Sequence, residues 1–261
     1  MIDELHPANV RSLGLEFIEL AAPDIEALER DLVKLGFVAI AKHRHKPVML
    51  YRQGDINLIV NESPTGSAHD LALEYGVTVC ALGLLVEDAM VAYSELLKRG
   101  AWAAETNAGV MELNIPAIEG IGGSKIFLID RMPNRPTIYD VDFTPVAMTS
   151  SQGDSLGSVR RLSLKVVEGR EQEWLDFFTQ LLGFEAVADQ PNLVQCPNSN
   201  LQVDLCPQLL PADQNVGSEH IGRITLAGHQ LPDGVTADAN GKLSLESHQP
   251  SSLGWYWESL S

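Results

Sequence analysis

Hydrophobic and polar residues follow the same order in two stretches of the chain, residues 13–41 and residues 156–188. Each stretch begins with Leu-Gly and an alternating run that predicts a β-strand, and then places apolar residues at helical spacing. Each ends in Leu-Gly-Phe-x-Ala-x-Ala, where Gly36 and Gly183 occupy the position of a helix-capping glycine. The pattern therefore predicts a strand–helix–strand unit that occurs twice.

The region between the two repeats predicts mainly strands. A hairpin is expected where Gly54 separates two apolar runs, and a helix is expected before Gly100. The predicted strands are Val48–Tyr51, Asp55–Asn61, Val77–Val86, Met111–Ile115 and Lys125–Asp130, and the predicted helix is Ala89–Lys98. These elements give two βαβββ units, at about residues 13–62 and 76–131.

The second repeat is shorter than the first. His220–Ala227 predicts a strand, but the following LPDGVTADANGKLSLES is too rich in Gly, Asp and Pro for a helix. Gly254–Glu258 predicts a last strand. We therefore expect an α+β fold of two tandem modules built from paired βαβββ units. The first covers residues 1–145, a linker covers 146–155, and an abridged second module covers 156–261.

The chain is acidic but has enough apolar material for a core. Its 261 residues include 18 Lys and Arg against 35 Asp and Glu, a formal net charge of −17, and 45% are hydrophobic. This composition excludes a disordered acidic protein. The negative charge disfavours nucleic acids and anionic membranes as partners, so an anionic ligand would require a locally positive pocket.

Cysteine usage and the distribution of apolar residues predict a cytoplasmic protein. Cys80, Cys196 and Cys206 are odd in number and form no CxxC pair, as expected of reduced thiols. The first residues are acidic where a signal peptide would be basic. No apolar run approaches the roughly 20 residues that a membrane helix needs.

One strand of the second module carries a row of polar residues. Alternation places Arg161, Ser163 and Lys165 on one face of this strand and apolar residues on the other. Two cations and a hydroxyl can hold a carboxylate by charge-assisted hydrogen bonds. Trp257 on the last strand can supply an apolar wall. The row therefore predicts a site for a small-molecule carboxylate or 2-oxo acid, and the alternative is a strand edge that faces solvent.

Three longer stretches carry a resemblance to a known family. LGLEFIELAAPD at 13–24, LYRQGDINLIVNE at 50–62 and MELNIPAIEGIGGSKIFLIDR at 111–131 resemble the 4-hydroxyphenylpyruvate dioxygenase family of the vicinal-oxygen-chelate superfamily. The resemblance implies open, curved sheets around a pocket. It also implies a divergent non-heme oxygenase, acting on an aromatic or 2-oxo acid, with Fe(II) or another divalent metal held by two histidines and one glutamate.

The resemblance assigns residues of this chain to the family's metal site. It implies His220 and Glu258 as ligands, while Arg161 stands at the place of the first histidine. A guanidinium cannot act as a ligand, and its charge opposes a divalent cation. In the first module Glu16 and Cys80 stand at the two histidine places, which argues against a metal there.

Three functions are compatible with these residues. The first is a metal-dependent oxygenase of the dioxygenase type. The second is a metal-free small-anion-binding or degenerate homologue that uses Arg161 and Lys165 in place of the metal. The third is an interaction module, such as part of a homo-oligomer, which would expose a large apolar patch.

Overall fold

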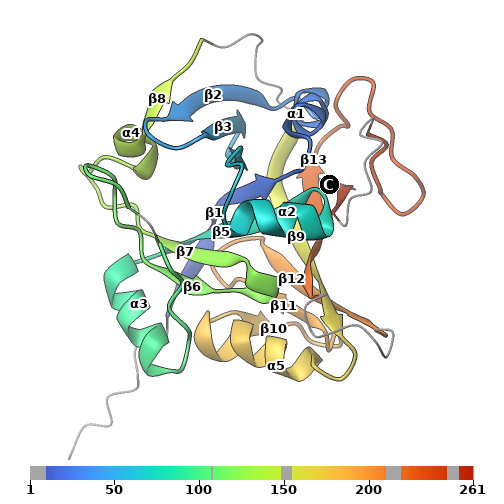
Figure 1. The fold of residues 1–261 in the computed structure, drawn as a ribbon. Coiled ribbons are helices and arrows are strands. Elements are labelled where there is room, and N and C mark those ends of the chain that lie inside the picture. Colours follow the sequence, from blue (N-terminus) through green and yellow to red (C-terminus); the bar gives the residue numbers. More distant parts are fainter. Residues whose placement is uncertain (1–9, 107, 148–154, 210–218, 246–252, 261) are drawn as a thin grey trace, which may run out of the picture.

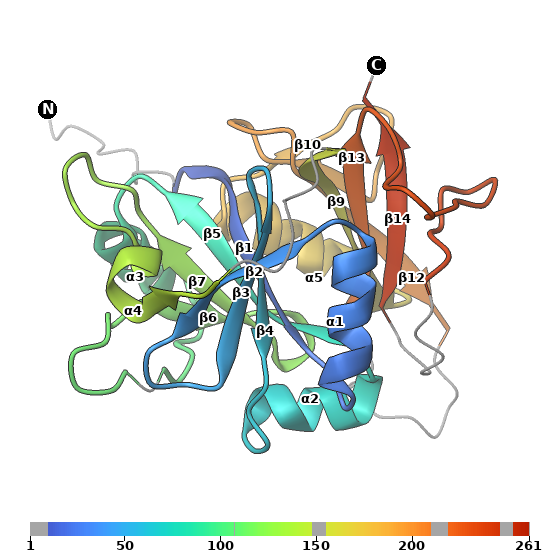
Figure 2. The same ribbon diagram turned by 90° about the horizontal axis from the view of Figure 1, so that it is seen from above.

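The computed structural model describes residues 10–106, 108–147, 155–209, 219–245 and 253–260. Two β-sheets with few helices make up the fold, which confirms the predicted α+β class. Seen from above, the strands of the first sheet and those of the second lie side by side (Figure 2). Each sheet is formed by one continuous part of the chain, as the repeat predicts.

The first sheet has eight strands in the order β6-β7-β5-β1-β4-β3-β2-β8 (Figure 1). The strands are β1 Ser12–Ala21, β2 Val38–His43, β3 Val48–Gln53, β4 Ile56–Asn61, β5 Thr78–Val86, β6 Ala117–Glu119, β7 Lys125–Ile129 and β8 Phe143–Pro145. The helices are α1 Ile25–Lys34, α2 Ser67–Tyr75, α3 Ala89–Lys98 and α4 Ile138–Asp142, with a 3₁₀ turn η1 at Ile121–Gly123.

The second sheet has six strands in the order β10-β11-β12-β9-β13-β14. The strands are β9 Leu156–Val167, β10 Glu185–Ala186, β11 Leu193–Gln195, β12 Gln202–Gln208, β13 His220–Gly228 and β14 Gly254–Ser259. The helix α5 Glu171–Asp176 continues as a π-helical turn, η2 Phe177–Leu181. β9 pairs in parallel with β12 and antiparallel with β13, so it lies at the centre of the sheet.

Local sequence signals explain the repeated strand–helix–strand unit. The carboxylate of Asp24 caps α1 by accepting a hydrogen bond from the main-chain nitrogen of Ala27 at 3.0 Å. Gly36 and Gly183 follow the two helices with φ of 89° and 71°, a left-handed conformation that favours glycine. Both predicted capping glycines are therefore confirmed.

The main hydrophobic core extends through both modules. It includes Leu20 and Leu82 from the first sheet and Leu164 and Ile224 from the second. The modules are also joined at the main-chain oxygen of Ser12, which accepts hydrogen bonds from side chains of the second module. The two sheets are thus packed as one body rather than as separate units.

The structure differs from the predicted elements at one strand and one helix, and most of the predicted linker lies outside the described residues. The strand predicted at Met111–Ile115 is wrong: Met111 is exposed with φ of 69°, and Glu112 accepts a hydrogen bond from the main-chain nitrogen of Gly109 in a turn. The strand lies instead at β6, and the helix α2 was not predicted. Most of the predicted linker lies outside the described residues, so the module boundaries stay a prediction.

The segment between β13 and β14, where the sequence predicts no helix, is described for residues 229–245 and 253. Between β13 and β14, the described residues form turns and an isolated bridge, Ala237 with Leu243, and no helix. None of the helices in the described part of the chain is long and apolar enough to cross a membrane.

Candidate functional site

Two cavities of similar size lie on the two sheets. A cavity of about 280 Å³ in the first module, called here the first-module cavity, is lined by residues of β1, β4, β5 and β7. A cavity of about 260 Å³ in the second module, called here the cationic cavity, is lined by residues of β9, β12, β13 and β14. The polar side chains of the cationic cavity are Ser163, Lys165, Cys206, Arg223, Lys242 and Tyr256.

Strand alternation and register bring the residues of the cationic cavity together. On β9, Leu162 and Leu164 are buried in the core, and the alternating Ser163 and Lys165 face the cavity. Arg223 on β13 lies opposite Ser163 in the antiparallel ladder. Neighbouring strands therefore place a hydroxyl and two cations around one hollow.

Two glycines allow side chains to lie flat across this surface. A Cβ atom at Gly222 would lie 2.8 Å from Cε of Lys165, so the lysine stem rests on the glycine. A Cβ atom at Gly254 would lie 2.8 Å from Cε2 of Tyr256. The guanidinium carbon of Arg223 lies 3.9 Å from the centre of the Tyr256 ring, which is a cation–π contact. Lys165 is thus held by packing on Gly222, and Arg223 by its contact with the Tyr256 ring.

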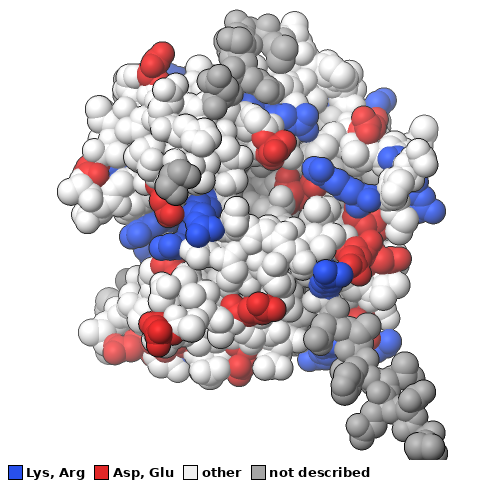
Figure 3. Space-filling view, turned by 180° about the vertical axis from the view of Figure 1, so that it is seen from behind, with Lys and Arg blue, Asp and Glu red and all other residues white. Residues whose placement is uncertain are grey.

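The cavity has both excess positive charge and an unsatisfied hydroxyl. Ser163 is only 3% exposed, and its hydroxyl has no hydrogen-bond partner among the described residues. Within that part of the chain, no carboxylate lies within 4 Å of the charged nitrogens of Lys165, Arg223 or Lys242. Groups of basic side chains are visible on one face of this acidic molecule (Figure 3).

A half-buried cysteine, Cys206, borders the same cavity. Cys206 donates a hydrogen bond to the Asp204 carboxylate at 3.5 Å. Burial raises the pKa of the Cys206 thiol to about 11, and the negative charge of Asp204 adds to the effect, while Arg223 and Arg161 oppose it. The thiol is therefore protonated at neutral pH and leaves the cavity its positive charge.

The structure places the other predicted anion-binding residues differently. Arg161 lies two residues before Ser163 on β9. Its guanidinium donates hydrogen bonds to Oε1 of Gln202 at 3.2 and 2.8 Å. Trp257 packs against the hydrophobic core. The wall of the cavity, predicted for Trp257, is formed by Tyr256. Of the predicted substrate-binding residues, the structure brings Ser163 and Lys165 to the cavity.

The predicted metal ligands do not converge. Glu258 on β14 lies opposite Ala227, seven positions beyond His220 on β13, which is roughly 23 Å of strand. The His220 ring stacks on Tyr75 of α2 with centroids 4.6 Å apart. The Glu258 carboxylate, half-exposed, pairs with Arg160 at 3.7 Å.

A wider search for ligands gives the same result. No group of three His, Cys, Asp or Glu side chains in the described residues could hold a metal ion. Because Arg161 stands at the third ligand position and the other two are far apart, these residues do not fit the metal implied by the resemblance.

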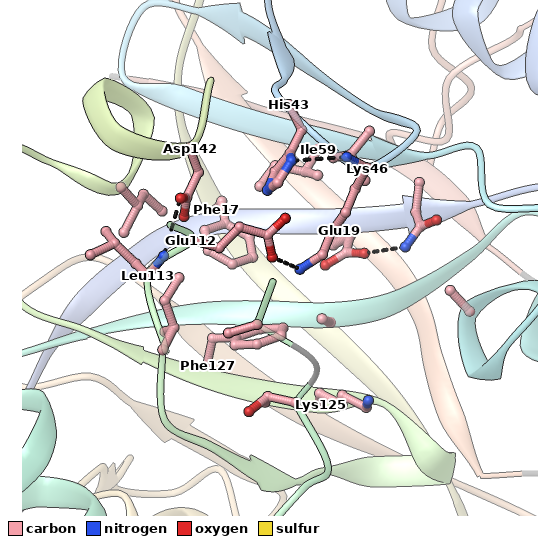
Figure 4. A pocket seen from close by; sticks show the side chains of 18 of the residues that line it. Phe17, Glu19, His43, Lys46, Ile59, Glu112, Leu113, Lys125, Phe127 and Asp142 are labelled. Atoms are coloured by element: carbon pink, nitrogen blue, oxygen red, sulfur yellow. Dashed lines mark hydrogen bonds and ion pairs between the residues drawn. The ribbon is translucent and has the colours of Figure 1, made fainter. Parts of the chain in front are cut away.

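The residues of the first-module cavity were not predicted. Glu19, Asn61 and Cys80 lie on its sheet wall, while Lys46 and Glu112 form an ion pair of 2.8 Å beside them (Figure 4). The sequence signal is Glu19, an acid between the apolar Ile18 and Leu20 of β1. Glu16, which the resemblance places at a histidine position, has its carboxylate held by Arg131 at 2.9 and 3.0 Å.

The paired modules and their sheet cavities define a protein of the vicinal-oxygen-chelate fold. Two solved structures share it. A triple mutant of 4-hydroxymandelate synthase from Streptomyces coelicolor matches with a TM-score of 0.68 and 13% identity, over 95% of this chain and 93% of that one. The Mn(II)-bound glyoxalase from Novosphingobium aromaticivorans matches with a TM-score of 0.56 and 10% identity, over 96% and 83%.

Residues 7–144 match the family model described as hydroxyphenylpyruvate dioxygenase, N-terminal. The chain belongs to this family. The 4-hydroxyphenylpyruvate dioxygenase of Pseudomonas sp. (strain P.J. 874) is 41% identical over 186 residues, which cover 70% of this chain and 52% of that protein. The chain thus spans about half the length of such curated relatives.

Proposed function

We propose that the second module binds a small carboxylate or 2-oxo acid in the cationic cavity and that it does so without a metal at the predicted ligands. The carrying observation is the buried Ser163 hydroxyl, which has no hydrogen-bond partner among the described residues and lies beside Lys165 and Arg223. A buried hydroxyl without a partner is costly, and a carboxylate oxygen would accept its hydrogen bond.

Each side chain has a distinct part in holding such an anion. Lys165 and Arg223 neutralise the carboxylate, and the Ser163 hydroxyl orients it by donating a hydrogen bond. The Tyr256 ring gives an aromatic ligand an apolar face, and Lys242, which is exposed, adds charge at the rim. The arrangement favours binding and orientation, and we assign no chemical step to it.

Isothermal titration calorimetry with phenylpyruvate tests this proposal. We expect one site per chain, and we expect Lys165→Met to weaken binding at least about tenfold because it removes the charge and keeps the stem over Gly222. Arg160→Met is the matched control, because Arg160 lies on the same strand but outside the cavity lining. Equal affinity of the Lys165→Met and wild-type proteins would contradict the proposal.

The family suggests a second candidate, a metal-dependent dioxygenase. The family match and the dioxygenase relatives favour it, and a Mn(II)-bound glyoxalase of the same fold supports a divalent metal at the level of the superfamily. It requires His220 and Glu258 to meet on one ion, against the register of β13 and β14. We therefore rank it second.

Metal analysis separates the two candidates. After anaerobic reconstitution with Fe(II) and desalting, we expect no stoichiometric metal in the wild-type protein or in Glu258→Ala. Stoichiometric iron that Glu258→Ala loses would support the dioxygenase instead, and oxygen consumption with phenylpyruvate would then be measured.

The third function, an interaction module, has one feature in its favour. On and just after α3, Met90, Val91 and Trp102 are 64%, 61% and 79% exposed. The described residues do not show what covers them, so the predicted homo-oligomer stays a prediction, as does the cytoplasmic location.

A further inference from the structure

We infer that the first module holds a second, independent ligand site: the first-module cavity binds a small one-ring aromatic molecule that carries a primary ammonium group. The cavity of about 280 Å³ contains an acidic side chain on its sheet wall and aromatic side chains around it. This site is separate from the cationic cavity, since it lies on the other sheet.

Glu19 is the acid that would receive the ammonium group. It projects from β1 between the core residues Ile18 and Leu20, toward the cavity. One of its carboxylate oxygens, Oε1, accepts a hydrogen bond from Nδ2 of Asn61 at 2.7 Å, which fixes the carboxylate in place. A carboxylate held on one side by an amide has lone pairs on its second oxygen to accept from a ligand.

The two lysines that line the cavity with Glu19 each have another partner. Lys46 lies beside it but is paired with Glu112 at 2.8 Å, and Figure 4 shows the three side chains pointing toward one another. Nζ of Lys125 donates to the main-chain oxygen of Glu105 at 2.7 Å. The lining carboxyl groups are Glu19, Glu105, Glu112 and Asp142, and the lining lysines are Lys46 and Lys125. Because acids outnumber lysines, the cavity favours a cation.

The histidine in the cavity does not change this balance. The pKa of His43 is lowered, chiefly by burial and then by Lys46, so its ring is neutral at neutral pH. Its Nδ1 accepts hydrogen bonds from the main-chain nitrogens of His45 and Lys46. The ring proton is therefore on Nε2, where it can donate to a ligand but adds no charge.

The remaining wall is aromatic and aliphatic. The rings of Phe17 and Phe127 lie 6.1 Å apart, and Phe143 lines the same space. The face of a phenyl ring attracts both the edge of another ring and a cation. A cavity of this volume, with Glu19 on its sheet wall and several rings around it, suits a single aromatic ring on a short chain that ends in an amine.

Binding of 2-phenylethylamine, followed by isothermal titration calorimetry and by ligand-observed NMR, tests the inference. We expect one saturable site per chain, at least about tenfold weaker in Glu19→Gln, because a charge-assisted hydrogen bond becomes a neutral one. Gln can still accept from Asn61, so the local structure is kept. Glu87→Gln controls for net charge, since Glu87 is exposed and pairs with Arg11 outside the cavity. We expect 3-phenylpropionate, which has the same ring but the opposite charge, not to displace 2-phenylethylamine from this site.

Three results would overturn the inference: no saturable binding at millimolar concentration, equal affinity of Glu19→Gln, or displacement of 2-phenylethylamine by 3-phenylpropionate. Phe127→Leu provides a second variant, expected to weaken binding by reducing the aromatic wall. Lys165→Met should leave amine binding unchanged, so failure of this site and failure of the carboxylate site are distinguishable.

Discussion

The first-module cavity and the cationic cavity are built alike and differ in chemistry. In the first module, Glu19 projects from β1 between Ile18 and Leu20; in the second, Ser163 projects from β9 between Leu162 and Leu164. All four flanking residues are at most 1% exposed. The core face of the repeated strand is thus kept, while the opposite face carries an acid in one module and a hydroxyl beside lysine and arginine in the other.

This difference shows that the fold and the ligand chemistry are specified by opposite faces of the same strand. Core positions must stay apolar to stabilise either module. Cavity positions have no such constraint, so they can change the sign of the site without changing the sheet. The family match, which is strongest for the first module, therefore transfers the fold more securely than it transfers a metal site.

The largest effect is expected from the core positions that the two modules share. Leu20→Ala and Leu164→Ala should each lower the free energy of unfolding by about 2–5 kcal/mol, because each leaves a cavity in a close-packed core. Urea unfolding followed by circular dichroism measures the loss. The same experiment with the exposed Leu73→Ala is the control, for which we expect little change.

These variants also test whether the modules are one body. Trp174, Trp255 and Trp257 lie in the second module, so tryptophan fluorescence reports mainly on it, whereas circular dichroism reports on both modules. Because one core extends through both sheets, we expect coincident transitions by the two probes. Separate transitions would show that the two modules fold independently and would break the comparison.

Each cavity also contains a cysteine beside an acid, and neither thiol should be reactive. Burial raises the pKa of Cys206 to about 11, and it raises that of Cys80 as well, where Glu19 adds to the effect. At pH 8 the thiolate fraction of Cys206 is then on the order of 0.1%, so alkylation should be roughly 100-fold slower than in the unfolded chain. Iodoacetamide labelling followed by mass spectrometry measures both rates.

A variant identifies the cause of this low reactivity. Asp204→Asn should speed the labelling of Cys206 because it removes the carboxylate that disfavours the thiolate. It should leave Cys80 unchanged, since Asp204 is not among the groups that shift the Cys80 pKa. Rapid labelling of Cys206 in the folded wild-type protein would contradict the assignment.

A smaller effect is expected at the glycine under Lys165. Gly222→Ala places a Cβ atom within 3 Å of the lysine stem, so the ammonium group must move. We expect binding of phenylpyruvate to weaken about tenfold, a loss of about 1.4 kcal/mol, with little change in stability because the stem is flexible. Gly234→Ala is the control. A Cβ atom there would have no neighbour within 4 Å, so this variant measures only the backbone strain of a residue with φ of 75°.

Much of the fold could be predicted because it depends on short-range patterns. Hydrophobic alternation predicted the strands β1, β3, β4, β5, β7, β9, β13 and β14. The capping glycines Gly36 and Gly183 predicted the ends of the two repeated helices, α1 and α5 with its turn η2. The error at Met111–Ile115 arose because apolar residues alternate there, although Met111 and Leu113 are exposed and Glu112 fixes a turn. Periodicity alone cannot show which side of such a segment meets a core.

The site was less predictable because it depends on register and on side-chain partners. Alternation correctly placed Ser163 and Lys165 on one face, but it could not show that Gln202 holds Arg161. Nor could it show that β14 pairs with β13 so that Glu258 lies opposite Ala227. Arg223 and Tyr256 were missed for the same reason, since only the strand pairing brings them beside Ser163.

The smallest expected effect distinguishes the acid of the first-module cavity from the neutral hydroxyl of the second. Burial raises the pKa of Glu19 above its ordinary value of 4.5, although hydrogen bonds from Asn61 and Cys80 oppose the shift. The folded chain therefore keeps this proton in a pH range where the unfolded chain has released it. As pH rises from about 4.5 through the folded pKa, the contribution of Glu19 to stability falls.

Glu19→Gln does not titrate, so its stability relative to wild type should increase between about pH 4 and pH 7. Ser163→Ala, which removes no titrating group, should show a constant difference. Urea unfolding at both pH values measures this, and a Glu19→Gln difference that stays constant or decreases would show that the buried carboxylate is not under electrostatic strain.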